Sequence, residues 1–220
     1  ILRGGYWQEV VVGSECCLKR AAWVNEQGPD WEPWPFSVEV VGHEEMVGVL
    51  RDIESGEGWW ALDLETIPGD GVKAGAVSVL SVAYREESGL TVAKVASWPG
   101  KMLWGCLKEV IEKRWAGLVG HNFNYDRAWL VNVGAWPAQA GVGMDTMQVW
   151  KRRFAELPKS LAFCSMWAFG QHLPYWKDEG KRLHAKRKKT DEEQLAYWRY
   201  GGKDAVATLW LGEWLAEKGE

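Results

Sequence analysis

An apolar run that ends in two carboxylates constrains the fold of this chain more than any other stretch. Residues 58–65, "GWWALDLE", have the composition of a buried strand up to Leu62 and then carry Asp63 and Glu65. Strand side chains alternate between the two faces of a sheet, so these two carboxylates point the same way. Two like charges this close are unfavourable unless a cation lies between them. The stretch is therefore either a solvated strand end or half of a metal site.

The hydrophobic patterns on either side of this strand predict alternating strands and helices. A capping-box pattern, Thr190 followed by Glu193, marks the start of the last helix. The predicted elements are, in chain order, short strands at "QEVVVG" and "FSVEVV" within an irregular or β-rich lead-in at 1–40, a helix at 43–55, the strand at 58–65, hairpin strands at 76–85 and 90–98, a helix at 102–115, a short buried strand at 116–121, and helices at 124–133, 144–157, 158–170 and 190–215. This order predicts an α/β layer fold with a mixed sheet flanked by helices.

Length and composition fit one substantial domain, or one domain with an extension. The 220 residues are 47% hydrophobic, and we interpret 58–220 as the domain and 1–57 as an N-terminal extension of unknown role. The net charge of −4 argues against a protein that coats nucleic acid through its overall field, but it allows a local basic patch. The chain has no apolar run of about 18 residues, which predicts no membrane partner. Its four cysteines form no C-x-x-C pair, and this favours free thiols in the cytoplasm.

Asp126 is the first candidate partner for the two carboxylates, because a site for two divalent ions needs roughly four carboxylates. It lies in the first turn of a predicted helix, after the buried strand at 116–121. A helix N-terminus favours acidic residues in any case, so this position alone does not distinguish a metal ligand from an ordinary first-turn residue. Asn122, four residues earlier, is a candidate hydrogen-bond donor to a phosphate, a sugar or a carboxylate.

Asp204 is the second candidate. It lies among apolar neighbours on the last predicted helix, and Tyr200, one turn earlier, shares its face. A buried carboxylate costs free energy unless it is compensated, which favours a ligand; the alternative is a surface aspartate paired with Lys203 or Arg199. Between the tyrosine and the aspartate, Gly201–Gly202 cost about 1 kcal/mol each relative to alanine. They indicate either a kink or a close backbone approach.

Three motifs thus follow one another along the chain: D-x-E on a strand, N-x-x-x-D after a second strand and Y-x-x-x-D on a late helix. Over residues 58–215 they resemble the motifs of DEDD-superfamily 3′→5′ exonucleases, and Tyr200 resembles the tyrosine subclass. The histidine subclass would carry its histidine where Arg199 stands. The stretches most similar to the proofreading domains of bacterial and phage family A DNA polymerases are "VGHNFNYDRAWL", "YGGKDAVATLWL", "MDTMQVW", "ELPKSLAF" and "PYWKDEGK". This resemblance implies a ribonuclease H-like fold.

The resemblance also implies an activity, cofactors and partners. Two divalent cations, Mg²⁺ or Mn²⁺, would be held by four carboxylates, those of Asp63, Glu65, Asp126 and Asp204. Tyr200 would orient the attacking water through its hydroxyl. The chain would release nucleoside 5′-monophosphates from the 3′ end of single-stranded DNA, as a proofreading activity in phage-type replication. A DNA polymerase, in cis or in trans, would be its partner in the cytoplasm of a bacterial host or a phage-infected cell.

Four further positions are similar to substrate-contacting or supporting positions of the same family. Thr66 and Asn122 would contact the terminal nucleotides, and ordinary turn chemistry is the alternative for both. His121 is a candidate neighbour of the substrate, with a structural histidine as the favoured interpretation. Asp145 belongs to the family pattern, and we expect it to cap a helix or support the site rather than bind metal.

A basic segment at 177–190 directly precedes the helix that carries Tyr200 and Asp204. A basic run is usually a solvated face, but at this place we expect it to contact the phosphates of a single strand. The candidate phosphate-binding residues are Lys181, Arg182, Lys186 and Arg187.

Three other functions fit parts of the pattern. An RNA-trimming exonuclease of the ribonuclease D type would use the same four carboxylates and tyrosine on RNA. A catalytically silent exonuclease fold would serve as a DNA- or polymerase-binding module, although silent relatives commonly lose a metal carboxylate and all four are present here. A ribonuclease H-type endonuclease distributes its acidic residues differently. The sequence therefore favours a DNA exonuclease first and an RNA exonuclease second.

Overall fold

A computed structural model describes Glu15 and residues 36–67, 75–169, 180, 182–184, 186 and 188–218. Its six strands are β1 (Phe36–Val40), β2 (Trp60–Ile67), β3 (Ala76–Arg85), β4 (Thr91–Ser97), β5 (Leu118–Gly120) and β6 (Met144–Asp145). They form one sheet in the order β1-β4-β3-β2-β5-β6. The β2–β3 and β3–β4 pairs are antiparallel, whereas the β1–β4, β2–β5 and β5–β6 pairs are parallel. The predicted mixed sheet is confirmed.

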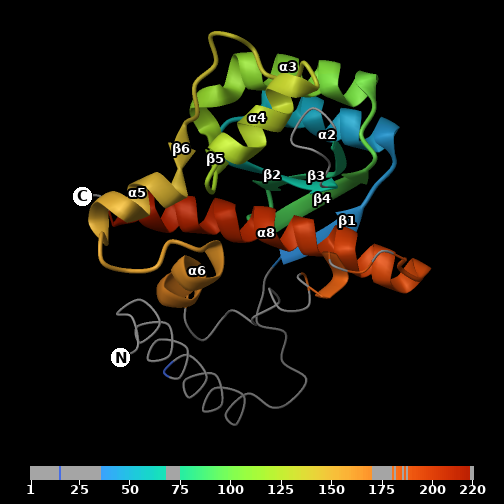
Figure 1. Cartoon of the computed structure of the whole chain (residues 1–220). Helices are drawn as coiled ribbons and strands as arrows, with labels where there is room; N and C mark the ends of the chain where they lie inside the picture. Colours follow the sequence, from blue (N-terminus) through green and yellow to red (C-terminus); the bar gives the residue numbers. More distant parts are fainter. Residues whose placement is uncertain are drawn as a thin grey trace.

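Helices cover both faces of this sheet, as Figure 1 shows. They are α2 (His43–Ser55), α3 (Lys101–Arg114), the 3₁₀ turn η1 (Trp115–Gly117), α4 (Asn124–Asn132), α5 (Thr146–Arg153), α6 (Leu161–Phe169) and α8 (Asp191–Glu217). The group α2, α3 and α4 lies on one face, and α8 crosses the opposite face (Figure 1). Among the helices described, none is both long and apolar enough to cross a membrane.

The alternation of side chains along β2 determines which residues face which helix layer. Leu62 and Leu64 are buried in the core formed with α2 and α3, whereas Ala61 is buried against α8. Asp63 and Glu65 have the same parity as Ala61, so the strand directs both carboxylates toward the α8 layer.

Helix α8 lies close to the sheet because Gly201–Gly202 carry no side chains. A Cβ atom at residue 202 would lie 2.5 Å from Cγ1 of Val38, and one at residue 201 would lie 3.0 Å from Oγ of Ser81. The helix runs without interruption from Asp191 to Glu217. The sequence allowed either a kink or a close backbone approach at the glycine pair, and the structure shows the close approach.

Residues 36–57, which the sequence interpretation placed in an extension of unknown role, supply β1 and α2. Strand β1 pairs with β4 along its whole length, and Met46 and Leu50 of α2 are completely buried. This part of the chain therefore belongs to the same sheet and core as the strand that carries Asp63 and Glu65.

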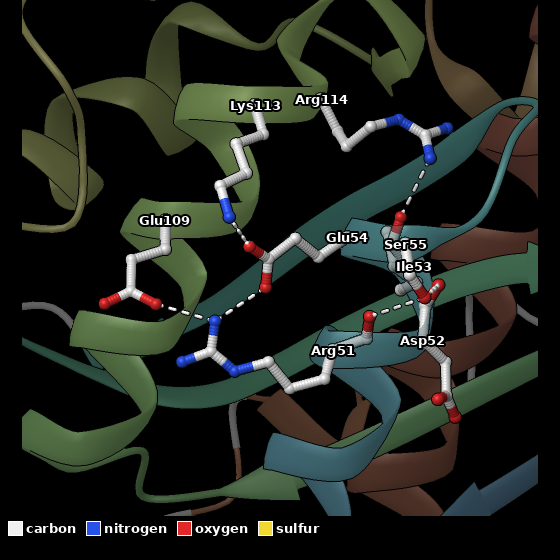
Figure 2. A network of polar contacts seen from close by, with 8 residues as sticks. All are labelled: Arg51, Asp52, Ile53, Glu54, Ser55, Glu109, Lys113 and Arg114. Atoms are coloured by element: carbon white, nitrogen blue, oxygen red, sulfur yellow. Dashed lines mark hydrogen bonds and ion pairs between the residues drawn. The ribbon is translucent and has the colours of Figure 1, made fainter.

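A network of charged side chains joins α2 to α3 (Figure 2). Arg51 Nη1 lies 2.6 Å from carboxylate oxygens of both Glu54 and Glu109, and Lys113 also pairs with Glu54. Arg114 donates hydrogen bonds to main-chain carbonyl oxygens at the end of α2 and just before β2. Single exposed ion pairs contribute little, so the network's clearest effect is that Arg114 links the end of α2 to the residues before β2.

The helix predicted at 144–157 begins later and ends earlier than expected. Residues Met144–Asp145 form strand β6 beside β5, and helix α5 follows. The Asp145 carboxylate accepts hydrogen bonds from the main-chain N–H groups of Met147 and Gln148, as an N-cap does. This outcome agrees with the capping role expected for Asp145. Because Asp145 is the N-cap, the helix begins after it and not at residue 144, where the sequence pattern placed the start.

The helix predicted at 158–170 also begins later, as α6. The Ser160 hydroxyl accepts a hydrogen bond from the N–H of Phe163, which places the start of the helix after the serine rather than at the proline. The predicted end at residue 170 lies outside the described part of the chain.

Candidate metal centre

Three of the four predicted carboxylates converge between β2 and α8. Asp63, Glu65 and Asp204 each offer an oxygen atom, and these oxygens lie within 4.8 Å of one another. Asp204 is only 5% exposed, and the two β2 carboxylates are half-buried. Carboxylates held this close repel one another in water-poor surroundings, and a divalent cation would relieve that repulsion. This acidic cluster could therefore bind metal.

The fold brings the cluster together through a local irregularity and a missing side chain. A shift in the β2–β3 register lies between Glu65 and Thr66, directly after the second carboxylate. A Cβ atom at Gly201 would lie 3.3 Å from Cγ of Glu65, so the glycine leaves the space that this side chain uses. Asp204 follows one turn later on α8.

Asp126, the fourth predicted carboxylate, stands beside this cluster rather than within it. Strand β5 pairs with β2 only at Trp60 and Ala61, so the N–H of Leu64 lies beyond the end of its neighbouring strand. Asp126 Oδ1 accepts a hydrogen bond from that N–H at 3.1 Å. Burial, and then the charge of Asp63, raises the pKa of the Asp126 carboxyl well above its usual range.

The raised pKa predicts how the stability of the metal-free protein depends on pH. The folded state holds the Asp126 proton more tightly than the unfolded state, so stability falls as pH rises through the folded-state pKa. Asp126→Asn keeps an acceptor for the Leu64 N–H without the charge. We expect the variant to be more stable than wild type at neutral pH in EDTA and equally stable below about pH 4. Urea unfolding across this range measures the difference; a variant that is not more stable at neutral pH would contradict it.

Tyr200 lies next to the cluster from α8. Burial, and then the charges of Asp204 and Glu65, raises the pKa of its hydroxyl, and the same hydroxyl is hydrogen-bonded to Asp204. Gly180 packs on the ring so tightly that a Cβ atom there would lie 2.1 Å from the ring atom Cε2. In the metal-free protein, Tyr200 therefore keeps its proton at neutral pH and acts as a hydrogen-bond donor.

A second tyrosine, which the sequence analysis did not identify, also contacts the cluster. Tyr197 is 5% exposed, and its hydroxyl donates a hydrogen bond to Glu65 Oε2 at 3.3 Å. A signal was present in the sequence, because Tyr197 lies two turns before Asp204 on the same face of the helix. Burial, and then the charge of Glu65, raises the pKa of Tyr197, so its hydroxyl remains a donor.

Thr66 and Tyr125 join the end of β2 to the start of α4. Their hydroxyl oxygens lie 2.6 Å apart, and the Tyr125 ring, edge-on to Trp129, is 49% exposed. Thr66 is itself buried, so its hydroxyl meets Tyr125 rather than solvent. The exposed aromatic ring next to Asp126 is a second residue that the sequence analysis missed.

Asn122 and His121 differ in their surroundings, because the Asn122 side chain is exposed whereas the His121 ring bonds to neighbouring residues. Asn122 is exposed in a left-handed conformation (φ 57°), and its main-chain N–H donates to Asp145 Oδ1. His121 Nδ1 lies 2.8 Å from the Thr146 hydroxyl and Nε2 lies 2.9 Å from the Lys159 carbonyl oxygen. This bridge agrees with the structural interpretation of the histidine.

The basic segment is described in part. Arg182 is exposed, and Lys186 Nζ pairs with the Glu193 carboxylate at 2.6 Å, beside the capping box of α8. Lys181 and Arg187 lie outside the described residues. A phosphate-binding role for this segment stays a prediction.

No family model matches the sequence, and no curated protein matches it. Among solved structures, the chain is similar to Trypanosoma brucei RNase D in complex with RNA U12, with 13% identity and a TM-score of 0.55. The similarity covers 84% of this chain and 64% of that protein, so the chain spans less than two thirds of its length. Brucella melitensis NrnC is similar with 13% identity and a TM-score of 0.49, over 83% of this chain and 79% of that one. The likeness to RNase D agrees with the expected ribonuclease H-like fold.

Proposed function

We propose that the chain is a metal-dependent 3′→5′ exonuclease that shortens single-stranded nucleic acid, with RNA as the favoured substrate class. The observation that carries the proposal is the convergence of Asp63, Glu65 and Asp204, with Asp126 beside them. Their order along the chain and their places on β2, α4 and α8 match the three motifs noted in the sequence.

The donor set fits hard divalent cations. All four side chains offer carboxylate oxygens, the ligands that Mg²⁺ and Mn²⁺ prefer, and the described part of the site has no cysteine ligand. When bound, two such cations supply a water of lowered pKa and stabilise the charge on a leaving 3′-oxygen.

The chain's own residues would hold and orient the substrate. Tyr200 keeps its proton, so it orients the attacking water or a phosphate oxygen by donating a hydrogen bond. The exposed ring of Tyr125 offers a surface on which the terminal base can stack, and Thr66 fixes its hydroxyl end. Such stacking contributes about 1–3 kcal/mol per base and does not depend on sequence.

The comparison favours RNA over DNA. The neighbour with a TM-score of 0.55 is an RNase D bound to RNA, which supports the ribonuclease D-type alternative more than the proofreading interpretation. DNA remains the second candidate because stretches such as "VGHNFNYDRAWL" resemble polymerase proofreading domains. A DNA polymerase partner belongs to that second candidate only.

Digestion of two matched 5′-labelled single strands, RNA and DNA of one sequence, tests the proposal. With Mg²⁺ or Mn²⁺ we expect a ladder that shortens from the 3′ end, faster on RNA. EDTA and the double variant Asp63→Ala/Glu65→Ala should each abolish it. Faster digestion of DNA would favour the second candidate. If folded wild-type protein cleaves neither strand, or if cleavage survives EDTA, the exonuclease proposal is wrong.

A further inference from the structure

We propose that Tyr197 is a positioning residue for Glu65, and that its hydroxyl sets the affinity of the candidate metal centre for divalent cations. The inference rests on the proposed function to the extent that this centre binds metal. Tyr197 donates to the Glu65 carboxylate, so the role we assign to it is to position that side chain, which differs from the role proposed for Tyr200.

The two tyrosines of α8 are hydrogen-bonded to different carboxylates. Tyr197 donates to Glu65 Oε2 at 3.3 Å, across the space between α8 and β2. Tyr200, one turn later, is hydrogen-bonded to Asp204 on its own helix. A carboxylate that contributes one oxygen to a cation is commonly oriented by a hydrogen bond at the other, and Tyr197 supplies such a bond from the opposite layer.

Glu65 is also held at its main chain. The Ser78 hydroxyl on β3 donates to the Glu65 carbonyl oxygen at 3.0 Å. With the backbone fixed by β3 and one carboxylate oxygen bonded to Tyr197, the side chain loses much of the freedom that a glutamate has at a strand end. Metal binding then costs less conformational entropy, because the Glu65 side chain is already partly ordered.

Tyr197 is itself firmly placed. It is buried together with Val79, Val95 and Leu183. Two residues of the basic segment also contact it: Lys189 Nζ lies 4.8 Å from the ring centroid, and His184 Nδ1 lies 3.4 Å from the hydroxyl oxygen. These contacts pack the ring on several sides, and its hydroxyl lies within hydrogen-bond distance of the Glu65 carboxylate.

Calorimetric titration of nucleic-acid-free protein with MnCl₂ tests this role in Tyr197→Phe. The variant keeps the packed ring and removes only the hydroxyl, so it should fold like wild type. We expect its Mn²⁺ affinity to be about 10-fold lower, the usual effect of losing a residue that orients a metal ligand. Tyr84→Phe makes the same change at a half-buried site on β3, where Tyr84 pairs with Trp60 whereas Val79 pairs with Glu65. This control should leave the affinity unchanged.

Enzyme kinetics supply a second readout. In Tyr197→Phe, the Mn²⁺ concentration needed for half-maximal rate should rise about 10-fold, and saturating Mn²⁺ should restore kcat with KM for the strand unchanged. Wild-type Mn²⁺ affinity in the variant, or a rate loss that saturating metal does not restore, would overturn the inference while the exonuclease proposal stands. If wild type binds Mn²⁺ through Asp63 and Glu65 but cleaves no strand, the exonuclease proposal fails and the affinity comparison still decides on Tyr197.

Discussion

Replacing Asp204 by asparagine is expected to lower the exonuclease rate by about 1,000-fold or more at a fixed metal concentration, equivalent to about 4 kcal/mol of transition-state stabilisation. Asp204 is 5% exposed and is the one member of the acidic cluster that comes from α8. Asparagine has nearly the same shape but lacks the charge that attracts a cation. The variant should therefore fold normally and lose metal-dependent cleavage.

The measurement compares initial rates on the preferred strand for wild type, Asp204→Asn and a matched control. Asp52→Asn makes the same chemical change at an exposed position on α2, on the opposite face of the sheet, and should retain full activity. Thermal unfolding in EDTA should show that Asp204→Asn is at least as stable as wild type, because one of several mutually repelling charges is gone. A variant that keeps more than a tenth of the rate would show that the cluster is not the reaction centre.

The main features of the site follow from local patterns. Strand alternation predicted that Asp63 and Glu65 share a face, and their oxygens lie in one cluster with that of Asp204. The helical spacing of Tyr200 and Asp204 predicted one helix face, and the two side chains are hydrogen-bonded. Such relations depend only on the repeat of a strand or a helix, which the sequence displays directly.

Contacts between distant segments were not predictable in the same way. The bond from Tyr197 to Glu65 depends on how closely α8 approaches β2, and no single segment encodes that distance. The same holds for Asp126, whose partner is a main-chain N–H left free where β5 stops. The sequence predicted the helix at 43–55, but it did not show that residues 36–40 pair with β4 and complete the sheet.

The glycine pair of α8 illustrates the difference. The sequence pattern shows that the two glycines are costly in a helix. The sheet beneath the helix explains why glycine occurs at these positions. Val38 and Val95 lie where a side chain at residue 202 would go, at 2.5 Å and 2.8 Å from a Cβ atom. Both are β-branched residues in paired strands and cannot rotate away easily.

Gly202→Leu is therefore expected to lower the free energy of unfolding by about 3 kcal/mol and the melting temperature by about 10 °C. Gly48→Leu is the matched control, because a Cβ atom at that position of α2 would meet nothing within 4 Å. In the control, the better helix propensity of leucine should raise stability by about 0.5–1 kcal/mol. Urea and thermal unfolding of the two variants compare the same substitution with and without the sheet beneath it.

The two variants should differ in metal binding as well. Tyr200 and Asp204 flank Gly202 on α8, whereas Glu65 belongs to the sheet, so a side chain that pushes the helix outward separates the two halves of the acidic cluster. Mn²⁺ affinity of folded Gly202→Leu should fall together with its stability, and Gly48→Leu should keep wild-type affinity. Loss of stability with unchanged Mn²⁺ affinity would mean that the cluster does not depend on the close approach of α8 at this glycine.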